Sequence, residues 1–406
     1  MQPLNIRSHN LSRVLRHIAH AEGPLSRADI AAHTGLAKPT VSNLVDQLVT
    51  GGLVAEGAPE RLGGTGRPMT PLRASRDGAI GIGIEVSADH VAVMLRQLDG
   101  STSASSHTRG DFTNAPEAAA ASAAELLIPL IHALRPATRI AGITAAIPGR
   151  ISHDRRTVTS APNLGWTDVP FSQLLHNQLT AHLNAENTTA PHASGSRGPA
   201  GHTRHQSLPI PLCGNDARLV ARTEMTRRPG ESFVVVHGET GIGGTLVING
   251  DILHGSQGWA GEIGHVVVDP NGPPCRCGRS GCLESYASAW VLRKRANISD
   301  DAAIDEIPEL INPEVLDDLA YWLGIGLAST LTLLDVPTVV LSGYFGRLFP
   351  QIHERVAATV AEHSLAAEAR QITIAQAAEI DNAPLIGSSI YSLKPLFDDP
   401  LPWLES

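Results

Sequence analysis

The most restrictive feature of this sequence is a stretch from Gly238 to Glu284 that holds three of the chain's four cysteines. His265 precedes Cys275, Cys277 and Cys282, and glycines separate the last two thiols. Imidazole and thiolates are the ligands that four-coordinate zinc prefers. The alternatives are ordinary core cysteines or a disulfide, but a Cys-x-Cys pair cannot easily bridge to itself and nothing indicates export. We therefore predict a structural zinc site, because these four ligands leave no open coordination position.

Two carboxylates flank the predicted zinc site. Glu262 lies shortly before His265, and Glu284 lies shortly after Cys282. Carboxylates held beside a metal ligand suit a pocket for a hydroxyl-rich ligand, whereas isolated acids are usually solvated surface groups. At this point the sequence resembles the ROK family, named for its repressors, open reading frames and kinases. The segment 264–284 matches that family's pattern of Gly-His, nine residues, and then Cys-x-Cys-Gly-x-x-Gly-Cys-x-Glu in full.

The charge is distributed unevenly along the chain. The formal net charge of the 406 residues is -9, yet residues 1–76 carry nine Lys/Arg and five Asp/Glu, so the remainder carries -13. A basic head on an acidic body is typical of a chain in which one domain contacts nucleic acid. No apolar run approaches the roughly 18 residues that a membrane span needs, and no signal layout begins the chain. We therefore expect a cytoplasmic protein of two or three domains without a membrane partner.

Residues 1–76 have the pattern of a winged helix-turn-helix domain. Apolar residues at helical spacing over 11–18 predict a first helix, and a capping box at Ser26–Asp29 begins a second one. Gly35 then supplies the left-handed turn residue, and a third helix begins near Lys38. The family's repressors carry such a domain, while its kinases generally lack it.

Two short strands follow the third helix, over residues 53–56 and 69–72, and they flank an Arg/Gly-rich loop that predicts a wing. The polar face of the third helix suits base edges and phosphates, and the arginines of the loop suit a backbone or minor-groove contact. The residues expected to contact DNA are Lys38, Thr40, Ser42, Asn43, Arg61 and Arg67. The alternative is a small three-helix packing module that binds no nucleic acid.

We expect residues 77–212 to form the first of two lobes. Apolar strand-like runs alternate with helical segments, and this periodicity alone predicts an α/β fold. The expected strands cover 79–86, 90–98, 101–108 and 140–147, and the expected helices cover 116–134 and 171–183. The resemblance implies a two-lobed actin-like ATPase, or sugar-kinase-type, domain with residues 161–166 beside the sugar. Residues 184–207 are rich in Thr, Ser, Gly, His and Pro, which predicts a flexible surface insertion.

We expect residues 213–406 to form the second lobe, which carries the zinc site. The predicted elements are strands over 210–213, 232–237 and 338–341, a hairpin at Asn249–Gly250, helices over 286–296 and 313–333, and a terminal helix from Ala383 that returns to the first lobe. Glycines within 238–244 are a weak sign of a phosphate cradle, because turns also need glycine. Asn215-Asp216-Ala217 resembles the family's Asn-Asp-Ala core, whose aspartate is the base that deprotonates the sugar hydroxyl in the kinases.

The first strand of the first lobe decides between the family's kinases and its regulators. The kinases carry Asp-x-Gly-x-Thr there, where the acid positions magnesium and the small residues admit the γ-phosphate. This chain has Glu85-Val86-Ser87-Ala88, which crowds the phosphate position, and the threonine is missing. Because phosphoryl transfer depends on positioning, a displacement of about 1 Å costs roughly a hundredfold in rate. We therefore predict that the chain is not an active kinase.

The resulting hypothesis is a sugar-responsive transcriptional regulator, most simply a repressor, whose partners are an operator in double-stranded DNA and a sugar or sugar phosphate. The resemblance also implies a homodimer or a dimer of dimers. The residues expected to bind the effector are Asn215, Asp216, Glu262, His265 and Glu284, with His265 shared between zinc and sugar. Two alternatives stay open: an active ATP-dependent sugar kinase with Asp216 as its base, and an interaction module that binds neither DNA nor sugar.

Overall fold

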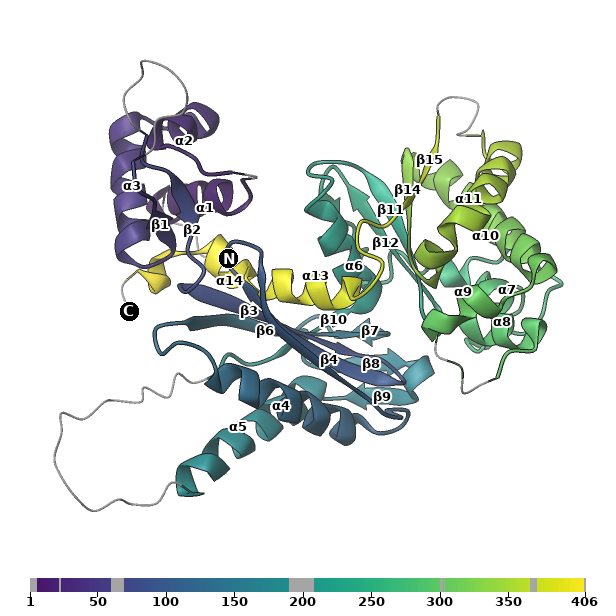
Figure 1. Ribbon diagram of the computed structural model, residues 1–406. Helices are drawn as coiled ribbons and strands as arrows, with labels where there is room; N and C mark the ends of the chain where they lie inside the picture. The colour runs from purple at the N-terminus through teal and green to yellow at the C-terminus, as the bar shows by residue number, and fades with distance from the viewer. Residues whose placement is uncertain are drawn as a thin grey trace.

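Figure 1 shows the computed structural model of the chain, whose described residues are 6–21, 23–59, 69–189, 208–299, 302, 304–365 and 371–404. The chain has an N-terminal head of short helices and two lobes that each contain a five-stranded sheet. The head and the second lobe lie on the same side of the first sheet, at its two ends. Within these ranges, every helix is too short or too polar to be a membrane span.

The head is a helix-turn-helix with a two-stranded wing. Its elements are α1 (Ile6–Ala19), α2 (Arg27–Thr34), α3 (Lys38–Thr50), β1 (Val54–Glu56) and β2 (Leu72–Ala74). Ser26 Oγ accepts a hydrogen bond from Asp29 N at 3.1 Å, and the Asp29 carboxylate accepts one from Ser26 N at 2.9 Å, which confirms the capping box. Gly35 has a φ of 68°, as the predicted left-handed turn requires.

The second strand of the head differs from its prediction over 69–72. It covers Leu72–Ala74, because it pairs with β1 in an antiparallel register that sets Val54 opposite Ala74. Arg61 and Arg67, which we expected on the loop between the two strands, lie outside the described residues.

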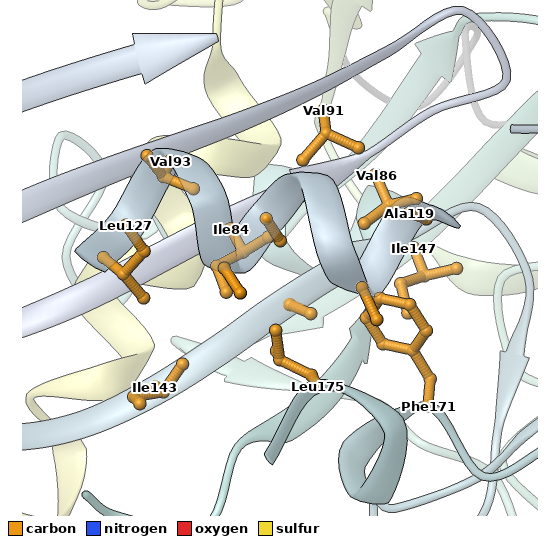
Figure 2. Close-up of a cluster of buried hydrophobic side chains, with 14 of the residues drawn as sticks. Ile84, Val86, Val91, Val93, Ala119, Leu127, Ile143, Ile147, Phe171 and Leu175 are labelled. Carbon is orange, nitrogen blue, oxygen red and sulfur yellow. The ribbon is translucent and has the colours of Figure 1, made fainter. Parts of the chain in front are cut away.

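The first lobe is built on a mixed sheet with the strand order β10-β6-β3-β4-β5. The strands are β3 (Ala79–Val86), β4 (His90–Gln97), β5 (Thr102–Arg109), β6 (Arg139–Ile147) and β10 (Leu212–Asn215). Helices α4 (Pro116–His132) and α5 (Phe171–Thr189) cover one face. Figure 2 shows Leu127 of α4 and Leu175 of α5 packed with Ile84, Val93 and Ile143 of the sheet. The apolar strand runs of the sequence therefore form the buried core of this lobe.

Beside this sheet lies a small one of three strands, which are β7 (Arg150–Ile151), β8 (Val158–Ala161) and β9 (Trp166–Val169), with η1 (Pro162–Leu164) between the last two. Helix α5 then continues to Thr189, so residues 184–189 are helical rather than part of a flexible insertion. Among the described side chains of this helix, Leu183 is the last one that packs against the hydrophobic core of the lobe. Residues 190–207 lie outside the described residues.

Strand β10 begins two residues later than the predicted strand over 210–213. It pairs in parallel with β6, with Asn215 opposite Ile147. The expected boundary between the lobes, at residues 212 and 213, therefore falls inside a strand of the first sheet. Asn215 stands at the carboxyl end of that strand, and helix α6 (Asp216–Met225) begins directly after it.

The second lobe has the strand order β13-β12-β11-β14-β15. Its strands are β11 (Phe233–Gly238), β12 (Ile242–Ile248), β13 (Asp251–Ile252), β14 (Thr338–Gly343) and β15 (Thr373–Gln376). Its helical segments are η2 (Ile263–His265), α7 (Glu284–Ala287), α8 (Ala289–Ala296), η3 (Ile304–Glu306), α9 (Ile307–Leu310), α10 (Pro313–Leu334) and α11 (Tyr344–His363). Asn249 and Gly250 have φ values of 50° and 79°, which confirms the predicted hairpin turn.

Three elements of this lobe differ from the sequence prediction. The helix expected over 286–296 is interrupted at Ser288, whose φ of -72° and ψ of 157° are extended, so α7 and α8 are separate. Helix α11 was not predicted, and Pro350 inside it is the residue that argues against a continuous helix. Strand β15 was not predicted either, because its half-buried edge position leaves no strong apolar pattern.

Helices α6 and α13 (Ala383–Ser392) lie side by side between the two lobes. A Cβ at Gly387 would collide with the carbonyl oxygen of Leu219, so the two helices meet backbone to backbone. Thr223 Oγ1 also donates to Ala383 O at 2.8 Å. Helix α13 covers the face of the first sheet opposite α4 and α5, so it contacts both the sheet and the helix that begins at Asp216.

The C-terminal segment ends against the head. Helix α14 (Lys394–Asp398) packs on α1, and η4 (Leu401–Trp403) follows it. Leu396 and Phe397 of α14 belong to the same buried cluster as Leu11 and Leu15 of α1. The head therefore shares one hydrophobic core with the C-terminal helices rather than hanging from a free linker.

Candidate functional site

The four predicted metal ligands come together in the second lobe. Ligand atoms from His265, Cys275, Cys277 and Cys282 all lie within 4.8 Å of one another. Cys275 Sγ is 3.9 Å from His265 Nδ1, and Cys277 Sγ is 3.7 Å from Cys282 Sγ. A tetrahedral zinc ion with Zn–S bonds of about 2.3 Å holds its ligand atoms about 3.8 Å apart, which these separations match. The side chains therefore fit a four-coordinate metal ion.

Backbone hydrogen bonds shape the loop that carries these ligands. Leu283 N donates to Val266 O at 2.9 Å, and Val268 N donates to Gly281 O at 2.8 Å, so the segments before and after the loop are paired. Cys275 N donates to Arg279 O at 2.7 Å, which closes the tight turn between the thiols. This pairing brings His265, at the end of η2, beside the cysteines.

Glu284 is anchored on the glycine-rich loop that follows β11. Its carboxylate is buried and accepts a hydrogen bond from Ile242 N at 3.1 Å. A Cβ at Gly241 would lie 2.5 Å from Glu284 Oε2 and 2.7 Å from Asn163 Nδ2, so only glycine lets both polar groups approach the loop. Asn163 was not among the predicted effector residues, although the resemblance of residues 161–166 to a sugar-side loop was a signal for it.

Asn215 and Glu262 line one small pocket between the lobes, with about 20 Å³ of free space. Asn215 caps helix α6, since its Oδ1 accepts from Arg218 N at 3.0 Å, and its Nδ2 donates to Gly149 O at 3.1 Å. Its neighbour Asp216 is buried. Burial raises the pKa of Asp216 well above its usual range, and the nearby Glu239 carboxylate raises it further. His265 and Glu284 are not among the residues that line this pocket.

The same pocket contains two arginines that the sequence prediction missed. Arg218 Nη2 donates to Gly258 O at 2.5 Å, which ties the first turn of α6 to the loop after β13. The guanidinium of Arg150 on β7 lies 4.1 Å from the ring centroid of Trp259. Trp259 is 55% exposed and lies between Gly258 and Ala260, which line the pocket, so this cation–π contact joins the first lobe to the second beside the pocket.

A second and larger cavity of about 410 Å³ lies between β3 and β4 of the first sheet and β11 and β14 of the second. Glu85, His237 and Glu239 are among the residues that line it. Ser87 Oγ donates a hydrogen bond to the Glu239 carboxylate across this cavity, from one lobe to the other. Glu239 belongs to the glycine-rich loop, whose glycines were only a weak sign of a phosphate cradle, and the sequence prediction did not assign it a role.

The electrostatics of this cavity depend on a histidine among acids. Burial raises the pKa of Glu85 to about 7, even though His90 Nε2 lies 3.9 Å from its carboxylate. Burial lowers the pKa of His90, but its 2.8 Å hydrogen bond to Asp89 and the charge of Glu85 outweigh this effect and raise the value to about 9. The imidazolium of His90 is therefore a cation beside the cavity's carboxylates, and Arg109 and Arg347 also line the cavity.

The third helix of the head carries four of the six residues that we predicted to contact DNA. Lys38, Thr40 and Asn43 are exposed on α3, and Ser42 is half-buried. Gln47 lies one turn further along and accepts a hydrogen bond at 2.6 Å from Arg7 of α1. Arg7 adds a guanidinium to this surface, and the sequence prediction had missed it.

Comparison with known proteins gives the wider context of these sites. Residues 81–196 and 203–394 match the ROK family, and residues 10–57 match the IclR helix-turn-helix domain. The xylose repressor of Bacillus spizizenii is 24% identical over 387 residues, which cover 92% of this chain and 92% of that protein. The likeness therefore spans the head as well as both lobes.

Two solved structures agree with the predicted fold. A ROK family transcriptional regulator, a homologue of the E. coli MLC protein, has a TM-score of 0.75 at 19% identity and covers 99% of this chain and 100% of that one. A ROK family glucokinase from Streptomyces griseus has a TM-score of 0.62 at 20% identity and covers 78% of this chain and 99% of that one. These likenesses confirm an α/β fold with an N-terminal helix-turn-helix and a sugar-kinase-type body. Because the family match covers more than half of the sequence, this chain belongs to the ROK family.

Proposed function

We propose that this protein is a sugar-responsive, DNA-binding transcriptional repressor whose kinase-like body binds a sugar or sugar phosphate without turnover. One arrangement carries the proposal. The head shares a hydrophobic core with the C-terminal helix α14, and the preceding helix α13 packs on α6, which begins at the sugar pocket. A relative that matches over the whole chain is named a xylose repressor, so xylose is the first sugar to test.

The effector site would combine groups from both lobes. Asn215 and Asp216 stand at the start of α6, and Glu262 faces them from the second lobe. His265 turns Nδ1 toward Cys275, which leaves Nε2 to meet a sugar hydroxyl, and Glu284 is held rigidly by the glycine-rich loop. Amide and carboxylate groups that are fixed by their neighbours suit a ligand with several hydroxyls.

Zinc is the ion that the cysteine cluster suits best. Three thiolates and one imidazole would complete its tetrahedral shell, so the ion would fix the loop between Glu262 and Glu284 and supply no catalytic position. The zinc and the effector pocket would then be coupled, because the loop that holds the ion also holds the carboxylate that recognises the sugar.

The response would pass along the helices that join the three parts of the molecule. A sugar held between Asn215 and Glu262 favours one angle between the lobes, and α6 moves with that angle against α13. Helix α14 continues from α13 to α1, so the head changes its position. In a homodimer or a dimer of dimers, this movement changes the distance between two heads that read two half-sites of an operator.

The interlobe cavity supports binding without phosphoryl transfer. A nucleotide phosphate near Ser87 would meet the acids Glu85 and Glu239, and each of them repels the phosphate in its ionised form. Phosphoryl transfer needs donors or cations that are free to meet the phosphate, whereas His90 is already engaged by Glu85 and Asp89. The runner-up is an active ATP-dependent sugar kinase with a regulatory head. Two features favour it, the size of the cavity and the position of Asp216, whose raised pKa suits a general base.

The test uses the purified full-length chain with its metal. A thermal-shift screen with xylose, other free sugars and sugar phosphates identifies the effector, since a ligand that binds the folded state raises the midpoint. An operator selected from random DNA is then titrated with and without that effector at fixed salt. We expect the effector to weaken operator binding. Sustained phosphate transfer from Mg-ATP to any sugar of the panel would establish the kinase instead.

In the same assays, Glu262→Gln should abolish the thermal shift and the operator response together. Glu117→Gln, on the exposed side of α4, is the control for a lost charge and should change neither. A full operator response in the Glu262→Gln protein would remove this pocket from the proposal.

A further inference from the structure

We propose that Asp216, His237 and Glu239 form a second metal site, for a divalent first-row transition ion, at the junction of the two lobes. Ligand atoms of the three side chains all lie within 4.8 Å of one another. The cluster is separate from the cysteines. The repressor proposal gives His237 no role, and it uses Glu239 only as a charge that disfavours a nucleotide phosphate. The inference goes beyond that proposal, because it assigns a metal ion to His237 and Glu239 and adds a metal-binding role to Asp216, which the proposal places beside the sugar.

The three ligands come from elements of different parts of the fold. Asp216 is the first residue of α6, directly after β10 of the first sheet. His237 lies near the end of β11 in the second sheet, and Glu239 follows that strand in the glycine-rich loop. Figure 1 shows α6 and β11 adjacent where the two lobes meet, and α6 packs against β11 and β12. An ion here would therefore connect the first sheet to the second.

His237 is the observation that points to a ligand. Its side chain is only 5% exposed, and its Nδ1 lies 3.3 Å from Ser342 Oγ. Its Nε2 is buried and has no hydrogen-bond partner among the described residues. A buried ring nitrogen without a partner is costly. Metal-binding histidines usually have their other ring nitrogen fixed by a hydrogen bond, and Ser342 Oγ is placed to fix Nδ1 here.

The two carboxylates complete the donor set. Asp216 is 7% exposed, and its Oδ1 accepts hydrogen bonds from Ala217 N at 2.7 Å and Asn215 Nδ2 at 3.0 Å, which fix the carboxylate. Glu239 is oriented by the hydrogen bond from Ser87. Glu85 adds a third acid, which is buried like Asp216, and the imidazole of His90 lies 3.9 Å from its carboxylate. Several acids sharing one buried space favour a bound cation.

The donor types select the kind of ion. One imidazole and two carboxylates suit zinc, manganese or iron, with water in the remaining positions, whereas a site for magnesium would use oxygen ligands alone. Asp216 would then be a metal ligand, so its carboxylate would not be free to take a proton from a sugar hydroxyl. The same residue that serves the family's kinases as a base would here hold the lobes together.

The test is metal counting on the full chain. Wild-type protein and its variants are dialysed against Zn²⁺ or Mn²⁺, and the bound metal per chain is measured by mass spectrometry. We expect two zinc ions per wild-type chain. Cys277→Ser should lose one of them, and Glu239→Gln and His237→Gln should each lose the other. Manganese, which thiolates bind poorly, should occupy one site in the wild type and bind at least about tenfold more weakly in Glu239→Gln.

Asp89→Asn is the matched control, because Asp89 lines the same cavity but is not one of the three ligands, and this variant should keep both zinc ions. His237→Gln changes a buried strand and could fail to fold. Glu239 lies on a loop, so the zinc content of Glu239→Gln then decides whether the second site exists. One zinc ion per wild-type chain, or two in both the Glu239→Gln and His237→Gln proteins, would overturn the proposal. Sugar-induced thermal shifts of the same samples test the repressor proposal separately.

Discussion

Arg16 Nη2 of α1 lies 2.6 Å from Asp398 Oδ1 of α14, so an ion pair joins the DNA-binding head to the C-terminal helix. Ser12 Oγ donates to Phe397 O at 2.6 Å along the same seam, and the Arg16 guanidinium lies 5.3 Å from the Phe397 ring centroid. Both partners of the ion pair are about 40% exposed, at 40% and 43%, so the pair contributes less than about 1 kcal/mol. The buried apolar contacts must therefore supply most of the coupling.

Replacing Phe397 should separate sugar binding from the DNA response. Phe397→Ala removes a side chain that is 7% exposed in the shared core, and we expect a loss of roughly 3 to 5 kcal/mol in unfolding free energy of the head. Sugar should still raise the thermal midpoint of the body, while operator affinity should no longer change with sugar. Asp398→Ala, on the same helix, should cost less than about 1 kcal/mol and keep the response. Equal responses in both variants would contradict this role of the core.

The contact between α6 and α13 gives a second prediction. Gly387→Ala forces a methyl group toward Leu219 O, so the helices must separate, and we expect a loss of roughly 1 to 3 kcal/mol. The sugar affinity should fall as well, because α6 carries Asn215 and Asp216 at its start. Gly23→Ala is the control, since nothing lies within 4 Å of a Cβ there. Urea unfolding and sugar titration of the two variants measure both effects.

The sequence predicted those parts of the molecule that local patterns encode. The capping box at Ser26, the turn at Gly35 and the ligand spacing from His265 to Cys282 each involve neighbours along the chain, and the structure brings those groups together as expected. The strand register of β2 and the break at Ser288 were missed, because pairing and packing partners rather than local sequence decide them.

Contacts between segments that lie far apart in the chain could not be predicted from the sequence patterns. Ser87 and Glu239 lie far apart in the chain. From the sequence alone, a glutamate in a glycine-rich loop is expected to be a solvated surface acid, and only the folded structure shows its contact with Ser87 in the other lobe. The same holds for Asn163, which approaches Glu284 only across Gly241. The effector residues were predicted from their spacing around the metal ligands and from a resemblance, whereas the role of the interlobe acids is visible only in the three-dimensional arrangement.

Loss of the cysteine cluster should remove metal and sugar response together. Cys277→Ser replaces one of the four ligands, and we expect at least about tenfold weaker zinc binding and no sugar-induced thermal shift. Cys213→Ala, which changes a buried cysteine outside the cluster, should keep the zinc. Metal analysis and the thermal-shift assay are made on the same samples. A Cys277→Ser protein with a full sugar response would show that the metal does not organise the pocket.

Glu224 on α6 should make stability depend on pH. Burial raises the pKa of this carboxyl above 4.5, and the hydrogen bond from Ala378 N at 2.8 Å only partly offsets that effect. The folded state therefore binds more protons than the unfolded state above pH 4.5, so the free energy of unfolding falls as the pH rises from 4.5 toward the raised pKa. Glu224→Gln keeps an acceptor for Ala378 N but cannot ionise, so its stability relative to the wild type should increase over that range.

Urea unfolding at a series of pH values measures this difference, and Glu231→Gln on the exposed surface controls for the change in charge. A Glu224→Gln protein whose advantage shrinks as the pH rises would contradict the assigned sign.

The exposed face of α3 gives the last prediction. Lys38 and Asn43 are both exposed there, and they should affect operator binding in different ways because one suits a phosphate and the other a base edge. Lys38→Ala should weaken binding to all DNA sequences and reduce the salt slope by about one. Asn43→Ala should cost roughly 1 to 3 kcal/mol on the selected operator and little on random DNA. Lys294→Ala, an equal change of charge on α8 in the second lobe, should leave both affinities unchanged. Fluorescence anisotropy at several salt concentrations measures the DNA affinities of these three variants. An unchanged operator affinity in both Lys38→Ala and Asn43→Ala would place the DNA contact on another surface.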